Sequence, residues 1–409
     1  MAPRLPSPPV SPPVFALNIH ADYHCRRQGA CCTAGWHVPI ETDRFDTLRS
    51  AMANGRLVAP DLPSGGTSTS APDGAFLIDN PPHGAAAVVG LDASGTCVFF
   101  DRRAGRRCAI HHACGHDHLP LTCQQFPRVA LIDARGVLLT LSHFCPTAAK
   151  MLLRDDVGRL AIVTNPSGAI LRNGYEGFDA GGTIPPLIRP HLVSDLAVAA
   201  AWDAFVVHTF GCDDATPEAA ISRLAHAAES IRAWRPGTAS LATLAEAAFG
   251  SAASNRDHRT TPMSPSSAGR LFLCAAMTTP RGLSRPALPA DLDHHHTRLV
   301  APVWASLARP VRRYLAAKAF GAWSAYIGEG LRTQIAMVAL ALGVLRVEAT
   351  RQAAEAGREL DEDLFVEAVR QSDLLLVHLA SEYALVRRMG RVEAMTREAY
   401  SAEIGIDLD

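Results

Sequence analysis

The chain has 409 residues, and its 39 basic and 40 acidic side chains leave a formal net charge of −1. Because neither sign dominates, the composition points to no nucleic acid and no anionic membrane as a partner. The longest strongly apolar run, residues 335–345, is shorter than the about 20 residues that a membrane-spanning helix needs. We therefore expect a buried core helix there and no membrane association.

The first 14 residues are rich in proline and serine, and we expect them to form a disordered tail. They contain no apolar segment like that of a secretory signal, so the sequence predicts a cytoplasmic protein. In that reducing compartment, spaced cysteines indicate metal or redox chemistry rather than a disulfide framework.

Residues 15–150 contain a recurring set of cysteines among turn signals and short β-like segments. The seven that we predict as metal ligands are Cys25, Cys31, Cys32, Cys97, Cys108, Cys123 and Cys145. Four thiolates complete a structural zinc site or hold a 4Fe–4S cluster, so the set exceeds the needs of one site. Either two sites exist, or one site has unused partners. Because adjacent side chains tend to diverge, we expect one of Cys31 and Cys32 to be the stronger ligand.

Two expected β-hairpins would bring distant cysteines together. The best strand candidates are 88–91, 97–100, 128–132 and 137–141. The last two flank a short turn, so their hairpin should place Cys123 and Cys145 together at its open end. A second hairpin, with its tip at 102–105, should do the same more loosely for Cys97 and Cys108.

Two polar clusters lie in the same region. One adds Cys114 and the histidines His111, His112, His116 and His118. Imidazole is a good zinc ligand, but the spacing is irregular, so we prefer a solvated loop and keep Cys114 as a further metal candidate. The other cluster comprises Arg102, Arg103, Arg106 and Arg107. Arginines suit carboxylates and phosphates, although such a run is more often a charged hairpin tip.

From residue 151 on, alanine- and leucine-rich helical periodicity replaces the β-like pattern. The expected helices are 192–209, 217–234, 239–249, 265–277, 301–327, 331–356 and 362–389. Asp361 is the expected N-cap of the last helix. We expect loops at 250–264 and at 278–296, the second of which includes His294–His296.

The predicted fold class is therefore α+β. A small cysteine-rich, metal-stapled domain with short hairpins at 15–150 precedes a mainly helical domain at 151–409. Within the helical part we expect Cys212 and Cys274 to be ordinary buried thiols. His378 is expected to be a core histidine with a satisfied ring nitrogen.

The sequence lacks several motifs of common enzymes. No G-x-G-x-x-G follows a strand, and no P-loop is present, so neither a dinucleotide-binding unit nor a nucleotide-triphosphate site is indicated. The spacing C-x-x-x-C-x-x-C of radical S-adenosylmethionine enzymes is also missing.

With these residues in view, the chain resembles the cysteine-cluster family of zinc- or iron-chelating proteins, and within it the flagellin lysine-N-methylase branch. The resembling segments are HCRRQGACC (24–32), GTCVFF (95–100), RRCAIH (106–111), LTCQQFPR (121–128) and LSHFCPTAAKMLL (141–153), and more weakly RRYLAAKAF (312–320) and VRQSDLLLVHLASEY (369–383). The family's first motif usually reads C-x-x-C-x-x-C-C, whereas here one cysteine precedes the doublet. Either Cys114 takes the missing place, or one site is lost.

The resemblance implies that the cysteines hold an iron–sulfur cluster (4Fe–4S) or zinc. It also implies transfer of a methyl group from S-adenosylmethionine to lysine side chains of a flagellin-like protein substrate. The lysine amine must lose its proton and meet the sulfonium in line, so positioning and a base or desolvation would carry the rate. The metal would organise the domain, because polar methyl transfer needs no redox centre. We expect a pocket with acidic or aromatic lining where the cysteine domain meets the helical half.

Two other interpretations stay open. One is a non-catalytic iron–sulfur or zinc protein for metal handling or electron transfer, which a redox-active brown chromophore without methyl transfer would indicate. The other is an interaction scaffold whose helical half binds a partner through an exposed apolar groove. Binding of S-adenosylmethionine would favour the enzyme over both.

Overall fold

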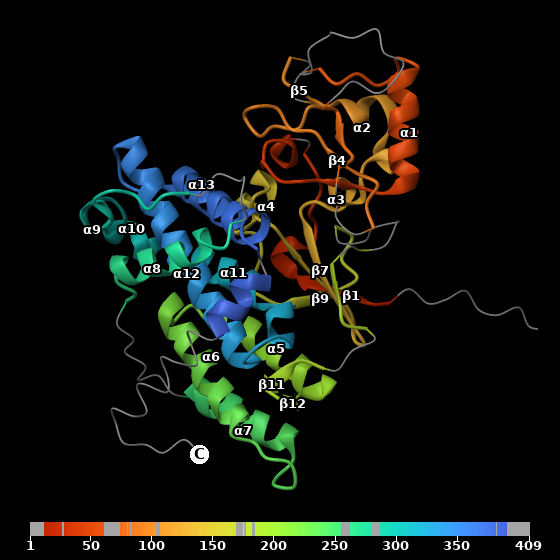
Figure 1. Ribbon diagram of the computed structural model, residues 1–409. Coiled ribbons are helices and arrows are strands. Elements are labelled where there is room, and N and C mark those ends of the chain that lie inside the picture. Colours follow the sequence, from red (N-terminus) through yellow and green to blue (C-terminus); the bar gives the residue numbers. More distant parts are fainter. Residues whose placement is uncertain are drawn as a thin grey trace, which may run out of the picture.

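The computed structural model describes residues 12–26, 28–60, 74–79, 81, 84–103, 107–168, 175, 177–181, 185–254, 262–279, 286–381 and 383–390. It combines small sheets with a helical C-terminal part, which confirms the α+β class (Figure 1). The expected tail at 1–14 lies outside the described residues up to residue 11, and its last residue, Val14, begins the first strand.

A five-stranded sheet with the order β10-β7-β8-β1-β9 lies between the segment that contains residues 30–126 and the helical C-terminal part. Its strands are β1 (Val14–Leu17), β7 (Arg128–Asp133), β8 (Gly136–Leu141), β9 (Ile162–Thr164) and β10 (Gly177–Asp179). Strands β7 and β8 form the expected antiparallel hairpin, with Arg128 opposite Leu141. Strand β1 runs parallel to β8 on its other side. Because the strands come from both sides of residue 151, this sheet joins the two predicted regions.

Gly136 allows the hairpin tip and β1 to approach each other. Its φ is +132°, and a Cβ atom there would lie 2.3 Å from the carbonyl oxygen of Pro13. Only glycine accepts both the conformation and the contact without strain.

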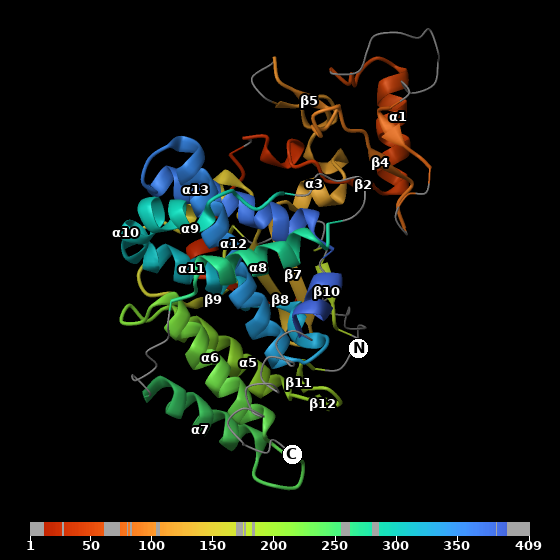
Figure 2. The same cartoon turned by 60° about the vertical axis from the view of Figure 1, so that its left-hand side comes forward.

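The segment between β1 and β7 forms a lobe that stands apart from the helices in both views (Figures 1 and 2). We call residues 30–126 the cysteine-rich lobe. Its elements are η2 (Ala30–Cys32), β2 (Pro39–Ile40), α1 (Thr42–Ala53), β3 (Phe76–Leu77), β4 (Ala87–Val89), β5 (Phe100–Asp101), β6 (Arg107–Cys108), α2 (Ala109–Cys114), η3 (His116–His118) and α3 (Leu121–Gln125). The lobe has its own apolar core, which includes Trp36, Leu48 and Phe99.

The second expected hairpin is present but shorter than predicted. Phe100 pairs with Cys108 and Asp101 with Arg107. Residues 97–99 do not extend the strand, because Cys97 makes only an isolated bridge to Leu91. The tip at 104–106 lies outside the described residues.

The two polar clusters differ in their agreement with prediction. The four histidines lie on α2 and η3, so the expected loop is wrong at that point: the backbone folds into short helical turns. Arg102, near the hairpin tip, donates to Asp92, Ser94 and Thr96. These contacts give it a structural role across the β5–β6 region.

The remaining described elements belong mainly to the helical half. They are α4 (Pro146–Met151), β11 (Leu187–Arg189), β12 (Leu192–Val193), α5 (Leu196–Phe210), α6 (Pro217–Arg232), α7 (Leu241–Ser254), α8 (Pro265–Ala276), α9 (Leu292–His295), η4 (His296–Val300), α10 (Ala301–Trp304), η5 (Ala305–Leu307), α11 (Ala308–Ala319), η6 (Trp323–Tyr326), α12 (Leu331–Ala356), α13 (Glu362–Asp373) and η7 (Leu374–Leu379), with 383–390 also helical.

Four expectations for this half need correction. The helix expected at 301–327 is interrupted after α11, where Gly321 takes a positive φ. The helix expected at 362–389 becomes a π-helix at η7 and is extended at Ala380. The loop expected at 278–296 is helical from Leu292, and its His296 is buried. The loop expected at 250–264 starts later, because α7 continues to Ser254; 255–261 lie outside the described residues.

Helix α12 runs through the centre of the helical half (Figure 2). Among the described residues it is the one helix long and apolar enough to cross a membrane, and 89% of its most apolar window is buried inside the protein. The buried helix predicted at 335–345 is therefore confirmed. The main core also takes Leu131 and Leu138 from the β7–β8 hairpin, so the sheet and the helices share one interior.

Candidate functional site

Five of the seven predicted metal ligands gather in the cysteine-rich lobe. We call them the five-thiol group: Cys31, Cys32, Cys97, Cys108 and Cys123. The Cys32 thiol lies at the centre, within hydrogen-bonding reach of Cys31, Cys97 and Cys108. The sulfur atoms of Cys31 and Cys32 are 3.9 Å apart. The adjacent pair, which lies on η2, therefore does not diverge as expected.

Backbone hydrogen bonds hold these thiols together from distant parts of the lobe. The amide of Cys97 donates to the carbonyl of Cys32 at 2.8 Å. Cys108 is fixed by its pairing with Phe100, and the Phe100 ring packs over Gly29 immediately before η2. A Cβ atom at Gly29 would lie 2.5 Å from that ring, so glycine is required for this close packing.

The thiols perturb one another's protonation. The hydrogen bond that Cys32 donates to Cys108 lowers the pKa of Cys108 to about 7 and raises the pKa of Cys32 far above its ordinary value. The hydrogen bond from Cys32 also lowers the pKa of Cys31. Burial raises the pKa of Cys123, and the neighbouring thiols raise it further. Several neighbouring thiolates would repel one another, so they can accumulate here only with a compensating cation. A bound metal supplies that positive charge and deprotonates its thiol ligands.

The donor chemistry of the five-thiol group suits zinc or an iron–sulfur cluster. Two thiolates on one tetrahedral zinc lie about 3.8 Å apart, which the Cys31–Cys32 distance of 3.9 Å matches. Throughout the described part of the chain, however, no three His, Cys, Asp or Glu side chains are arranged so that they could hold a metal ion. The group has the right atoms, but the metal-stapled domain itself stays a prediction.

The other two predicted ligands lie in a different place. The Cys145 sulfur is 3.6 Å from the Tyr23 hydroxyl, and Cys25 is close enough for its charge to act on the same tyrosine. The β7–β8 hairpin was expected to join Cys145 to Cys123. Cys123, on α3, packs with the lobe core, whereas Cys145 packs in a different cluster with Tyr23, Leu141 and Met151.

The remaining cysteines lie away from this group or at its edge. Cys114 packs on the lobe's apolar core together with four of the five thiols, Cys31, Cys97, Cys108 and Cys123. Cys212 and Cys274 are half-buried rather than fully buried, and Cys212 accepts a hydrogen bond from Arg159.

A groove of about 780 Å³ lies where the cysteine-rich lobe, the sheet and the helical half meet. We call it the junction groove. The lobe contributes Trp36 and Phe126, and the helical half contributes His378 from η7 and Trp323 from η6. The floor includes Phe178 of β10 and part of β7. A groove was expected at this junction, and its volume falls in the range of small-molecule sites.

Aromatic rings meet at two places in the junction groove. At one, the ring centroids of Trp36 and His378 are 4.0 Å apart, and Phe126 packs on Trp36 at 5.2 Å. At the other, Phe178 and Trp323 lie 5.6 Å apart. Faces of such rings attract ammonium and sulfonium cations. The acidic lining that was the alternative expectation is not found, because no Asp or Glu is among the described residues of the groove.

The polar groups of the junction groove are mainly donors. The indole N–H of Trp36 is buried and has no hydrogen-bond partner in the described part of the chain. A buried donor without a partner is costly, so this N–H is suited to a ligand's oxygen or a water molecule. Arg128 also lines the groove, with its guanidinium bonded to the carbonyl of Gly168.

His378 is not the core histidine that was expected. Its Nε2 is 2.7 Å from the Ser142 hydroxyl, so the satisfied ring nitrogen is confirmed, but the ring forms a wall of the groove. Burial lowers the pKa of His378 to about 3. The imidazole is therefore neutral at pH 7 and can exchange hydrogen bonds without repelling a cation.

A buried ionic network fixes the β8 end against the helical half, beside His378. The Asp373 carboxylate accepts hydrogen bonds from the Tyr314 hydroxyl at 2.8 Å, the His143 amide at 2.6 Å and the Lys318 ammonium. Burial alone would raise the pKa of Asp373, but Lys318 and the His143 side chain outweigh it and hold that pKa well below its usual range. The Asp373 carboxylate is fully enclosed, whereas the Lys318 side chain is partly exposed, and these contacts tie the end of α13 to α11 and to His143.

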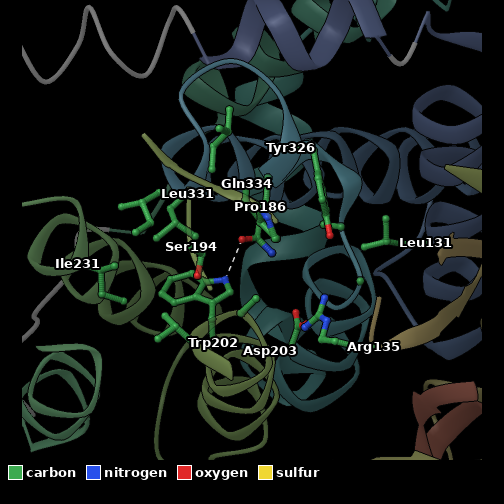
Figure 3. A pocket seen from close by; sticks show the side chains of 17 residues that line it. Leu131, Arg135, Pro186, Ser194, Trp202, Asp203, Ile231, Tyr326, Leu331 and Gln334 are labelled. Atoms are coloured by element: carbon green, nitrogen blue, oxygen red, sulfur yellow. Dashed lines mark hydrogen bonds and ion pairs between the residues drawn. The ribbon is translucent and has the colours of Figure 1, made fainter. Parts of the chain in front are cut away.

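A second cavity lies inside the helical half (Figure 3). Its volume is about 30 Å³, enough for one or two water molecules. Arg135 and Asp203 form an ion pair at 2.8 Å on one side, and Trp202 donates to Gln334 on the other. This space is too small for a cosubstrate and belongs to the core.

No protein-family model, curated protein or solved structure matches this chain.

The aromatic residues of the junction groove were not predicted from the sequence, because aromatic side chains in a helical or loop pattern usually belong to the hydrophobic core. One signal was present for the lobe side. Trp36 follows the Cys31–Cys32 doublet by four residues, and Phe126 follows Cys123 by three. Because each aromatic residue is so close in sequence to an expected ligand, the position of the cysteine also restricts the position of the ring, whatever secondary structure lies between them.

Proposed function

We propose that the five-thiol group holds zinc or an iron–sulfur cluster, and that the protein transfers methyl groups from S-adenosylmethionine to lysine side chains of a protein substrate in the junction groove. The observation that carries this proposal is the aromatic groove beside a cluster of buried thiols. The resemblance of the cysteine segments to the lysine-methylase branch supplies the reaction.

The lining of the junction groove supports cations as ligands. A sulfonium and a lysine ammonium both gain from aromatic faces, and the faces of Trp36 and Trp323 come from opposite parts of the molecule. The free N–H of Trp36 and the guanidinium of Arg128 suit the carboxylate of the cosubstrate. S-Adenosylmethionine carries both a sulfonium and a carboxylate, so it matches this pairing of rings and donors.

The residues of the groove would act by positioning and by excluding water. Methyl transfer needs a neutral amine in line with the sulfonium. An apolar, carboxylate-free lining disfavours the ammonium form of lysine, because burial lowers the pKa of an amine. Neutral His378 can accept a hydrogen bond from that amine and orient its lone pair. The metal would hold the lobe in shape and take no part in the transfer.

The experiment is calorimetry with S-adenosylmethionine on metal-replete protein, followed by transfer of a labelled methyl group to lysine-rich surface proteins of the same cell. Trp323→Leu should weaken cosubstrate binding about tenfold, the scale of one desolvated cation–π contact. Trp234→Phe, at the end of α6 and outside the groove, is the matched control and should bind as the wild type does.

If metal-replete protein binds no S-adenosylmethionine at millimolar concentration, the methyltransferase is excluded. A protein that still contains metal would then be the non-catalytic zinc or iron–sulfur protein.

A further inference from the structure

The two aromatic residues that form the lobe wall of the junction groove each follow a cysteine of the five-thiol group closely in sequence. Trp36 lies four residues after Cys32, and Phe126 lies three residues after Cys123. Cys32 and Cys123 belong to the same group of thiols, although 91 positions of sequence (123 − 32) separate them. The two rings that follow them pack on each other edge to face at 5.2 Å.

This pair of rings closes on the helical half through His378. The His378 ring lies 4.0 Å from Trp36 and 6.0 Å from Phe126. His378 is itself fixed by its hydrogen bond to Ser142, at the end of β8. On the helical side this hydrogen bond anchors the His378 ring, whereas the two lobe rings follow the segments that carry Cys32 and Cys123.

We propose that Trp36 is a positioning residue through which metal in the five-thiol group controls cation binding in the junction groove. With metal bound, Cys32 and Cys123 are fixed and the ring pair stands against His378. Without metal, no shared ion joins the segments that carry Cys32 and Cys123, and the pair loses its common support. This inference rests on the proposed metal site but not on methyl transfer.

Linkage makes the effect reciprocal. If metal strengthens cation binding by a given factor, a bound cation strengthens metal retention by the same factor. The ring pair is the connecting element, since it touches the thiol-bearing segments on one side and the groove on the other.

The test uses phenyltrimethylammonium, a quaternary ammonium probe that needs no enzymatic activity. Its dissociation constant is measured by NMR titration of full-length protein, as isolated with its metal and after chelation. The metal content of each sample is determined in parallel. For the wild type, removal of metal should weaken probe binding about tenfold, which corresponds to loss of one cation–π contact.

Two variants of Trp36 separate positioning from general stability. Trp36→Phe keeps an aromatic face and should bind the probe within about threefold of the wild type. Trp36→Leu should retain its metal but bind the probe about tenfold more weakly than the wild type. Chelation should then weaken probe binding by this variant little further, because the Trp36 ring that couples the metal to the groove is already gone. Trp234→Phe should show the full metal dependence of the wild type.

Three results would overturn the proposal. Metal-replete wild type might bind no probe, or chelation might leave its affinity unchanged. Alternatively, chelation could weaken Trp36→Leu by the same factor as the wild type, which would show that the effect does not pass through Trp36. Loss of methyl transfer with an intact probe response would count against the proposed reaction alone.

Discussion

Asp373 is the buried charge on which the contact between β8 and the helices depends. Its carboxylate is fully enclosed and receives donors from α11 and from the backbone of His143. A buried ion pair adds little net stability by itself, but removing one partner leaves the other charge uncompensated. Lys318 would be that charge.

Asp373→Asn should therefore lower the free energy of unfolding by about 3–5 kcal/mol, since the ammonium of Lys318 loses its counter-ion. Urea denaturation monitored by circular dichroism measures the change. Asp363→Asn, an exposed site in the first turn of the same helix, should cost less than about 1 kcal/mol. Equal losses in the two variants would contradict the role assigned to the buried network.

Glu348 makes the folded protein less stable as the pH rises. This is the reverse of the effect of a carboxylate whose pKa is lowered by folding. Burial raises the pKa of Glu348 from 4.5 to about 7, although Arg351 partly opposes the shift. Between these values the folded protein holds a proton that the unfolded chain has released. The stabilising contribution is therefore complete below pH 4.5 and is lost as the pH rises through about 7.

Glu348→Gln should remove this dependence. Relative to the wild type, the variant should gain about 2–3 kcal/mol in unfolding free energy between pH 5 and pH 8, the value of a shift of this size. Urea denaturation at both pH values measures it. Glu359→Gln, exposed just after the same helix, should show no such gain. A constant difference between Glu348→Gln and the wild type would disprove the assignment.

At the scale of elements, the hairpin β7–β8 is the clearest success of prediction from sequence. The β-prone segments RVALI and VLLTL on both sides of a turn indicate a hairpin, and the structure pairs them around that turn. Helix α12 was likewise bounded correctly, because its long apolar pattern has few alternatives. The breaks after α11 and at η7 were missed, since a π-turn or a positive φ at one glycine leaves no mark in the periodicity.

The hairpin tip provides the prediction at this scale. Gly136→Ala should lower the unfolding free energy by more than about 1 kcal/mol, because alanine resists the positive φ and its Cβ meets Pro13. Gly250→Ala, in the exposed part of α7 with open space around its Cα, should instead stabilise by about 0.5–1 kcal/mol. Thermal denaturation distinguishes the two directions. A neutral Gly136→Ala would mean that β1 does not depend on this approach.

At the scale of the whole molecule, two separate cores meet at one sheet. The cysteine-rich lobe packs around its own apolar residues, and the helices pack around α12 and the inner side of the hairpin. At the junction groove, Trp36 of the lobe contacts His378 of the helical half. Function at such a junction depends on both parts being held in place.

The sequence could predict the gathering of thiols but not their partition. Cysteine spacing and turn signals indicated a shared site, and five of the seven thiols do lie together. Which thiols share a site depends on the path between Cys123 and β7, where α3 intervenes, and no local pattern revealed that path. The groove joins residues about 340 positions apart, so only the tertiary structure could show it.

The most direct test of this account is the metal and acid-labile sulfide content of protein purified without oxygen. The account predicts either about one zinc per chain without sulfide, or about four irons with about four sulfides and a brown chromophore. Cys123→Ser should lose most of this metal, whereas Cys274→Ser, on α8, should retain all of it. A wild-type protein without stoichiometric metal, or equal metal in both variants, would contradict the central claim that the five-thiol group is a metal site.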